Sequence, residues 1–223
     1  GDSFVAGVCV ERQYTISGNL RKLGYENINL GKEGIGPLIQ LYMLKEYAKP
    51  LKPKIILWFY YENDLTDMYG ELSNPALSKY LNDENFNQNL FLRQKEIDRL
   101  ITVQDLGNNS KKSEIPSENI LVGTGYEKIF YFLQTPLIRI IKLSNIRYRL
   151  KFLTYDSYNP KNNEFINILK SAKETISEWE GKIYFIYLPS FNDYSTGIKH
   201  NMRNFVLQSI KELKIPLIDM HKE

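Results

Sequence analysis

The chain has 223 residues, which is enough for one sizeable domain with a hydrophobic core. Its 43% hydrophobic and 25% charged residues are ordinary for a globular protein and exclude a wholly disordered, collagen-like or coiled-coil chain. The 29 Lys and Arg residues against 26 Asp and Glu residues leave a net charge of +3, which is too small to indicate a nucleic-acid partner.

Patterns typical of helices and of buried strands alternate along the chain. In chain order they predict a helix over 9–23, a strand over 27–31, a helix over 38–48, a strand over 54–63, a helix over 165–179, a strand over 182–190, a helix over 202–213 and a strand over 215–220. Because a turn-like Gly1-Asp2-Ser3 opens the chain, we expect one more strand before Gly1, and we expect the chain to be the interior of a longer protein. The alternation predicts an α/β fold, with a parallel sheet covered by helices on both faces.

Residues 65–160 interrupt this alternation, because the segment is far longer than an ordinary connection between two strands. We therefore expect one domain over 1–223 with an insertion over 65–160 that acts as a lid or cap. Within it, the stretch 126–153 is both apolar and basic. It is compatible with a helical lid packed on the sheet and with an amphipathic helix that contacts a membrane surface; nucleic-acid binding is the least favoured alternative.

Cys9 is the single cysteine, so a disulfide within the chain is excluded, and we expect its thiol in the core beneath the first helix. The chain has no run of 18 apolar residues, the signal expected of a membrane-spanning helix. An acidic cluster of Glu62, Asp64 and Asp67 follows the strand over 54–63. No histidine accompanies it, so we expect a solvated loop there rather than a metal site.

Polar residues fall where three predicted strands end, and ligands of open parallel sheets bind at the carboxyl ends of the strands. Ser3 would follow the strand expected before Gly1, Gly34 lies in the loop after the second strand, and Asn63 follows the third. A serine becomes an effective nucleophile when a base takes its proton and donors stabilise the developing oxyanion. The backbone N–H groups of Ser3 and Gly34 and the amide of Asn63 are donors of the right type.

These residues resemble three sequence blocks of the SGNH (GDSL-type) hydrolase family. The segment Gly1-Asp2-Ser3-Phe4 resembles the first block, Asn29 followed by Gly34 resembles the second, and Glu62-Asn63-Asp64 resembles the third. The resemblance implies a three-layer, flavodoxin-like α/β/α sandwich that hydrolyses carboxylic esters through an acyl-enzyme. No metal and no organic cofactor are implied.

By the same resemblance Ser3 would be the nucleophile, and Gly34 and Asn63 would form the oxyanion hole. Tyr61 stands where the family usually has glycine. The family's last block is Asp-x-x-His, and the chain offers Asp219-Met220-His221, with one residue between them instead of two. Asp219 and His221 are therefore candidates for the acid and the base, while we expect the family's own Asp and His beyond Glu223.

The substrate implied by the resemblance is a small-molecule, glycan or lipid ester, with O-acetyl and lipid esters both compatible. Two alternatives stay open: an acyltransferase, and a catalytically idle relative that binds glycan or lipid or scaffolds a surface-polymer system. Bacterial members of the family with such insertions are often exported, periplasmic or membrane-anchored, and this is the localisation that the resemblance favours.

Overall fold

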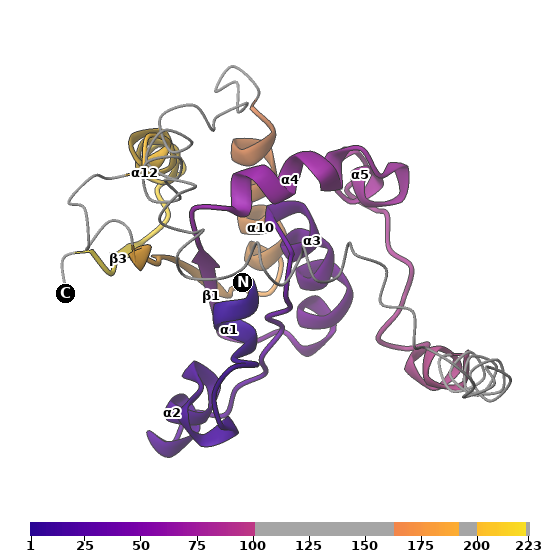
Figure 1. Ribbon diagram of the computed structural model, residues 1–223. Helices are drawn as coiled ribbons and strands as arrows, with labels where there is room; N and C mark the ends of the chain where they lie inside the picture. Colours follow the sequence, from indigo (N-terminus) through magenta and orange to yellow (C-terminus); the bar gives the residue numbers. More distant parts are fainter. Residues whose placement is uncertain (101–162, 192–199, 222–223) are drawn as a thin grey trace, which may run out of the picture. The chain divides into compact units, whose positions relative to one another are not determined.

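The computed structural model describes residues 1–100, 163–191 and 200–221 (Figure 1). The chain divides into two compact units, one of residues 1–93 with 160–223 and the other of residues 94–159. The fold and site described below belong to the first unit. The apolar and basic stretch 126–153 lies outside the described residues, so its predicted role stays a prediction.

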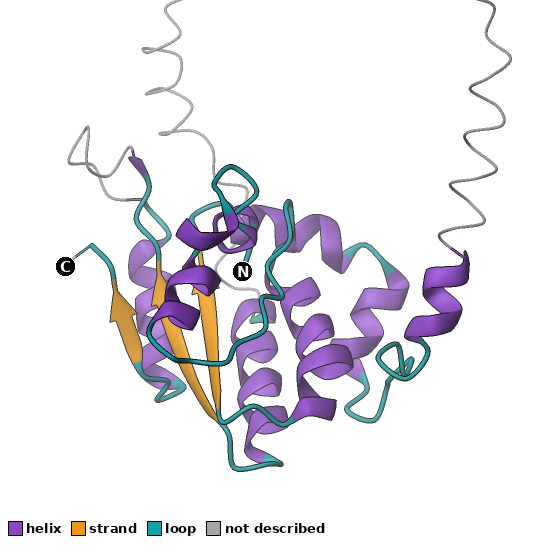
Figure 2. Ribbon diagram, turned by 90° about the horizontal axis from the view of Figure 1, so that it is seen from below, coloured by secondary structure: helices purple, strands orange, loops and turns teal. Residues whose placement is uncertain are grey.

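The first unit contains a parallel three-stranded sheet in the order β1-β2-β3. The strands are β1 (Ile55–Tyr60), β2 (Lys182–Tyr187) and β3 (Leu217–Asp219). In register, Tyr60 lies opposite Tyr187, and Tyr187 lies opposite Asp219. The carboxyl ends of the three strands therefore meet at one edge of the sheet, as Figure 2 shows. The predicted α/β class with parallel strands is confirmed.

Helix α10 (Glu164–Ser177) supplies much of the core through one apolar stripe. Its buried apolar residues are Phe165, Ile168, Leu169, Ala172 and Ile176, spaced at three and four as in an amphipathic helix. The Phe165 ring lies 5.9 Å from the ring of Tyr60 and 6.5 Å from that of Phe185, at centroids. The stripe therefore packs on the sheet through β1 and β2. Helix α12 (Arg203–Glu212) joins it through Phe205, whose ring lies 6.1 Å from Phe165.

Helix α3 (Pro37–Met43) begins at a proline, which suits the first helical position because that N–H has no partner within the helix. It continues as a π-helical turn (Leu44–Ala48) and a 3-10 turn (Lys49–Leu51). Helices α4 (Asp64–Leu72) and α5 (Pro75–Asn82) lie inside the predicted insertion and pack against α3. None of the described helices is long and apolar enough to cross a membrane.

The predicted strand over 27–31 is wrong, because these residues form an irregular segment that does not join the sheet. Their polar groups are used locally: Asn29 Nδ2 donates to the Val5 carbonyl at 2.7 Å, and the Gly31 N–H donates to Asn29 Oδ1 at 2.8 Å. The Lys32 N–H donates to the Gly1 carbonyl at 3.2 Å. The Asn29 side chain thus joins this segment to helix α1 (Ser3–Ala6) by a side-chain bond instead of a strand ladder.

The predicted helix over 9–23 is not continuous. Helix α1 lies before it and ends at Gly7, whose φ of 72° is a left-handed conformation that favours glycine. A 3-10 turn (Arg12–Tyr14) follows, and α2 (Ile16–Lys22) begins after Thr15, whose hydroxyl accepts the Gly18 N–H. Cys9 falls in the turn between the pieces and is exposed, so the expected core thiol is wrong.

Candidate functional site

Ser3 lies at the start of α1, in a turn held by its neighbour Asp2. Asp2 is 4% exposed, and its carboxylate accepts the Phe4 N–H at 3.1 Å as the N-cap of the helix. Ser3 itself is half-buried. Within the described residues, neither its hydroxyl nor its backbone N–H has a hydrogen-bond partner. The turn therefore presents an oxygen and an adjacent donor that the fold leaves unused.

The loop that contains Asn29 and Gly34 packs directly against this turn. The bonds from Asn29 to Val5 and from Lys32 to Gly1 join the two segments. A Cβ atom at Gly31 would lie 2.5 Å from the Ala6 nitrogen, so the close approach requires glycine. Gly34 is exposed with a φ of +63°, and in the described part of the chain its N–H makes no hydrogen bond.

The end of β1 reaches the same turn from the other side. A Cβ atom on Gly1 would lie 2.9 Å from the Cβ of Phe59, and the Phe4 and Tyr61 rings lie 4.5 Å apart at centroids. Asn63 follows two residues later, at the N-cap position of α4. It is exposed, and its Nδ2 donates to Asp67 Oδ2 at 2.8 Å. The amide predicted as an oxyanion donor is thus engaged by a neighbouring carboxylate in this conformation.

Asp64 is fully buried beneath the turn, which makes the expected solvated loop wrong at this position. Gln40 Nε2 donates to its Oδ2 at 3.1 Å, while its Oδ1 has no partner among the described residues. Burial raises the pKa of the Asp64 carboxyl well above its usual range, and the nearby Asp2 carboxylate raises it further. No group of three or more His, Cys, Asp or Glu side chains in the described ranges could hold a metal ion.

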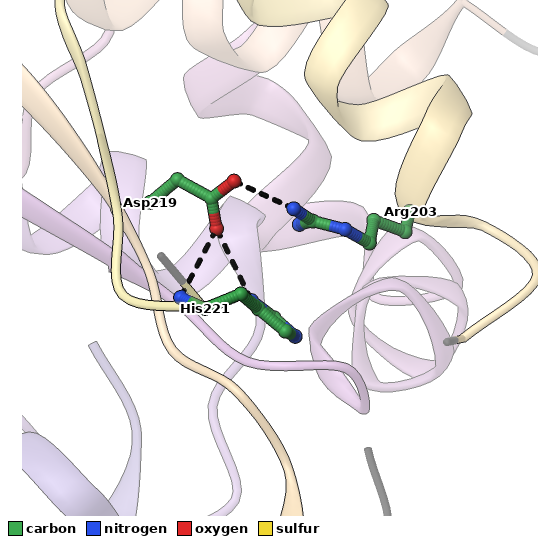
Figure 3. Close-up of polar contacts among 3 residues, drawn as sticks. All are labelled: Arg203, Asp219 and His221. Atoms are coloured by element: carbon green, nitrogen blue, oxygen red, sulfur yellow. Dashed lines mark hydrogen bonds and ion pairs between the residues drawn. The ribbon is translucent and has the colours of Figure 1, made fainter. Parts of the chain in front are cut away.

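Asp219 and His221 form a hydrogen-bonded pair at the end of β3 (Figure 3). His221 Nδ1 lies 3.1 Å from Asp219 Oδ1, which also accepts the His221 backbone N–H at 3.3 Å. Asp219 Oδ2 accepts a bond of 2.6 Å from Arg203 Nη2. Burial alone would raise the pKa of Asp219, but the bonds from Arg203 and His221 together lower it below its ordinary value.

Arg203 is the member of this cluster that sequence reasoning missed. It lies on α12, 16 residues before Asp219 in the chain, and no local motif marks it. Its guanidinium carbon lies 4.9 Å above the centroid of the Tyr187 ring, and its side chain is 6% exposed. The sequence carries no signal for it, because only the structure shows that this arginine is buried and paired with a carboxylate.

The structure brings together the Ser3 turn, the Asn29–Gly34 loop and the end of β1, and separately joins Asp219 to His221. Figure 2 shows the N-terminus beside the tip of β1, whereas Asp219 and His221 lie at the end of β3, with β2 between the two strands. Among the described residues, no hydrogen bond links the Ser3 hydroxyl to the His221 ring. Nucleophile and candidate base thus share one edge of the sheet without touching.

In comparisons with known proteins, no family model matches the chain, and no curated protein and no solved structure matches it. The resemblance to SGNH hydrolases, and the site residues it implies, therefore stay predictions. A functional proposal for this chain therefore depends on the residues that meet at the carboxyl ends of the strands.

Proposed function

We propose that the protein is a serine-dependent hydrolase of carboxylic esters of the SGNH type, with Ser3 as the nucleophile. One observation carries the proposal. The three segments singled out from the sequence are the Ser3 turn, the Asn29–Gly34 loop and the residues after β1, and they contact one another at the carboxyl edge of a parallel sheet. This is the edge at which open α/β sheets bind ligands.

In the proposed reaction, Ser3 Oγ attacks the ester carbonyl and its proton passes to a histidine. The bond from carbonyl carbon to alcohol oxygen then breaks, and the alcohol leaves with that proton. Water attacks the acyl-enzyme in the same way, releasing the acid and restoring Ser3. The Ser3 and Gly34 N–H groups, which have no partner in the described part of the chain, are available to donate to the oxyanion.

The proposal assigns the third oxyanion donor to Asn63 and the base to His221. Because Asp219 binds His221 at Nδ1, the proposal gives Nε2 the role of proton acceptor. Both assignments require a change on substrate binding. Asn63 must release Asp67, and the segment that carries His221 must approach Ser3.

The decisive experiment is covalent labelling of the 223-residue protein with a fluorophosphonate, followed by location of the adduct by peptide mass spectrometry. We expect one adduct, on Ser3, and none in Ser3→Ala. The control variant Ser177→Ala removes an exposed serine on α10, away from the turn, and should label like the wild type.

His221→Gln tests the base separately. Loss of labelling with the fold retained would assign the base to His221, whereas unchanged labelling would assign it to another group and leave Ser3 as the nucleophile. Absence of labelling in the folded wild type would overturn the hydrolase proposal. It would favour the binding module, in which Asn63 stays bonded to Asp67.

We also propose the finer fold, a flavodoxin-like three-layer sandwich, for this part of the chain. Its support is the parallel order β1-β2-β3, together with the position of Gly1 against Phe59, where a further strand would enter the sheet beside β1. An experimental structure in which the residues around Gly1 pair with β1 would confirm it, and pairing of another segment with that edge would contradict it.

A further inference from the structure

A groove of about 680 Å³ lies next to the Ser3 turn. Its lining comes from the Asn29–Lys32 loop, from α3 and the turn after it, from the start of α5, and from residues 88 and 90. This volume is within the range of small-molecule sites.

Aromatic and apolar side chains form one part of the lining. Tyr42, Met43 and Tyr47 come from α3 and the π-helical turn that continues it, and all three are half-buried. The Tyr42 and Tyr47 rings lie 6.3 Å apart at centroids and nearly perpendicular, at 86°. Each half-buried ring leaves part of its surface for a ligand to pack against.

Polar groups form the other part. Asn74 uses its Oδ1 to accept the Ala76 and Leu77 N–H groups, and its Nδ2 has no partner among the described residues. Gln88 donates through Nε2 to the Tyr80 hydroxyl, and in the same part of the chain its Oε1 is unpaired. Lys32 adds an exposed ammonium group. The groove thus offers both donors and acceptors beside its aromatic rings.

The part of the lining that contains Gln88 is held in place by the buried carboxylate of Glu46. Glu46 is 1% exposed, and its Oε1 accepts the Tyr80 hydroxyl and the Gln88 N–H, each at 2.6 Å. Its Oε2 accepts the Leu90 N–H at 2.8 Å. A buried carboxylate that fixes three donors makes this part of the lining rigid, so a ligand does not have to order it on binding.

The groove is continuous with the proposed catalytic site through a shared loop. Asn29, Gly31 and Lys32 line the groove, and the same residues bond to or pack against the Ser3 turn. An extended ligand in the groove would therefore lead toward Ser3.

We infer that this groove binds a short stretch of an oligosaccharide, whose ester-bearing sugar is presented to Ser3; this rests on the proposed function. Sugar rings have apolar C–H faces that pack on tyrosine rings and hydroxyls that both donate and accept hydrogen bonds. An acyl chain would desolvate Asn74, Gln88 and Lys32 without replacing their hydrogen bonds, which is unfavourable.

The test is isothermal titration calorimetry of the 223-residue Ser3→Ala protein with cellohexaose, xylohexaose and N-acetylchitohexaose, with sodium laurate as the acyl-chain probe. We expect at least one hexasaccharide to bind, Tyr47→Ala in the same background to weaken it by about tenfold, and Tyr47→Phe to retain most of the affinity. Tyr25→Ala is the matched control, because Tyr25 is 62% exposed and does not line the groove. Thermal unfolding of each variant verifies that it is folded.

Binding of laurate alone, or of no probe, would overturn the inference, as would hexasaccharide binding that Tyr47→Ala and Tyr25→Ala reduce equally. The proposed function has a separate readout, since fluorophosphonate labelling requires no sugar. Oligosaccharide binding without Ser3 labelling would refute the hydrolase and leave the groove, whereas labelling without oligosaccharide binding would refute the groove and leave the hydrolase.

Discussion

Removal of the Asp219 carboxylate should destabilise the protein strongly, because it leaves the Arg203 guanidinium buried without its partner. The two side chains are each 6% exposed and are joined at 2.6 Å. Arg203 Nη1 has no partner among the described residues, so removal of the Asp219 carboxylate would leave both terminal nitrogens of the guanidinium without one there. Breaking one side of a buried pair of this kind costs about 3–5 kcal/mol. For Asp219→Ala we therefore expect a loss of about 4 kcal/mol in the free energy of unfolding at pH 7.

Urea denaturation followed by circular dichroism measures this loss. With a slope of about 2 kcal/mol per M, the transition midpoint of Asp219→Ala should lie about 2 M below that of the wild type. The double variant Arg203→Met/Asp219→Ala should recover most of the loss, because it replaces the charge by an apolar chain of similar length. Arg203→Met alone should be destabilised as well, because the carboxylate then stays buried with only His221 as partner.

The effect should also depend on pH. Because the folded state lowers the pKa of Asp219, its carboxylate contributes stability that is complete at neutral pH. The contribution is lost as the pH falls below about 4, through the lowered pKa of the folded state. The difference in the free energy of unfolding between the wild type and Asp219→Ala should therefore become smaller from pH 5 to pH 3. A loss of less than about 1 kcal/mol at pH 7, or a double variant as unstable as the sum of the single ones, would refute this reasoning.

Other buried carboxylates lead to further predictions, each measured by urea denaturation. Glu71→Ala should cost about 3 kcal/mol, because Glu71 accepts the N–H groups of Gly36, Leu38 and Ile39 at the start of α3. Glu178→Ala is the control: it removes an exposed ion pair with Lys49 and should cost less than about 1 kcal/mol. Equal losses of stability in Glu71→Ala and Glu178→Ala would contradict the role of Glu71 at the start of α3. Asp64→Asn should be at least as stable as the wild type at pH 8. The raised pKa of Asp64 means that the wild type loses stability as the pH rises above about 4, and a less stable variant at pH 8 would contradict this.

The sheet was predictable from the sequence because its strands are continuous apolar and aromatic runs. Such runs are typical of strands covered by other elements, and β1 and β2 lie inside the predicted segments. The segment over 27–31 has only two apolar residues, which alternate with polar ones, and it lies at the surface, with Ile28 66% exposed. Asn29 binds Val5 across 24 residues of sequence, and a local pattern does not reveal a bond of that range.

The buried polar side chains were not predictable either, because their partners also lie far along the chain. Glu46, Glu71 and Arg203 lie in helical segments where charged residues usually face water. Each is buried because a partner far along the chain reaches it, such as Leu90 for Glu46 or Asp219 for Arg203. The sequence contains both partners of each pair but no periodic signal that joins them. The sequence therefore indicated that the segments around Ser3, Gly34 and Asn63 come together, but not which buried side chains support them, and the catalytic roles of these residues stay predictions.

The two oxygens of Asp219 have different partners, and this separates its possible roles. Oδ2 binds Arg203 and Oδ1 binds His221, so the carboxylate is held by α12 whether or not the imidazole is present. His221→Gln consequently removes the candidate base while it leaves the buried ion pair intact, whereas Asp219→Ala removes both. A catalytic role for His221 thus predicts that His221→Gln loses activity at nearly unchanged stability. A purely structural cluster predicts that activity follows stability in every variant of Arg203, Asp219 and His221.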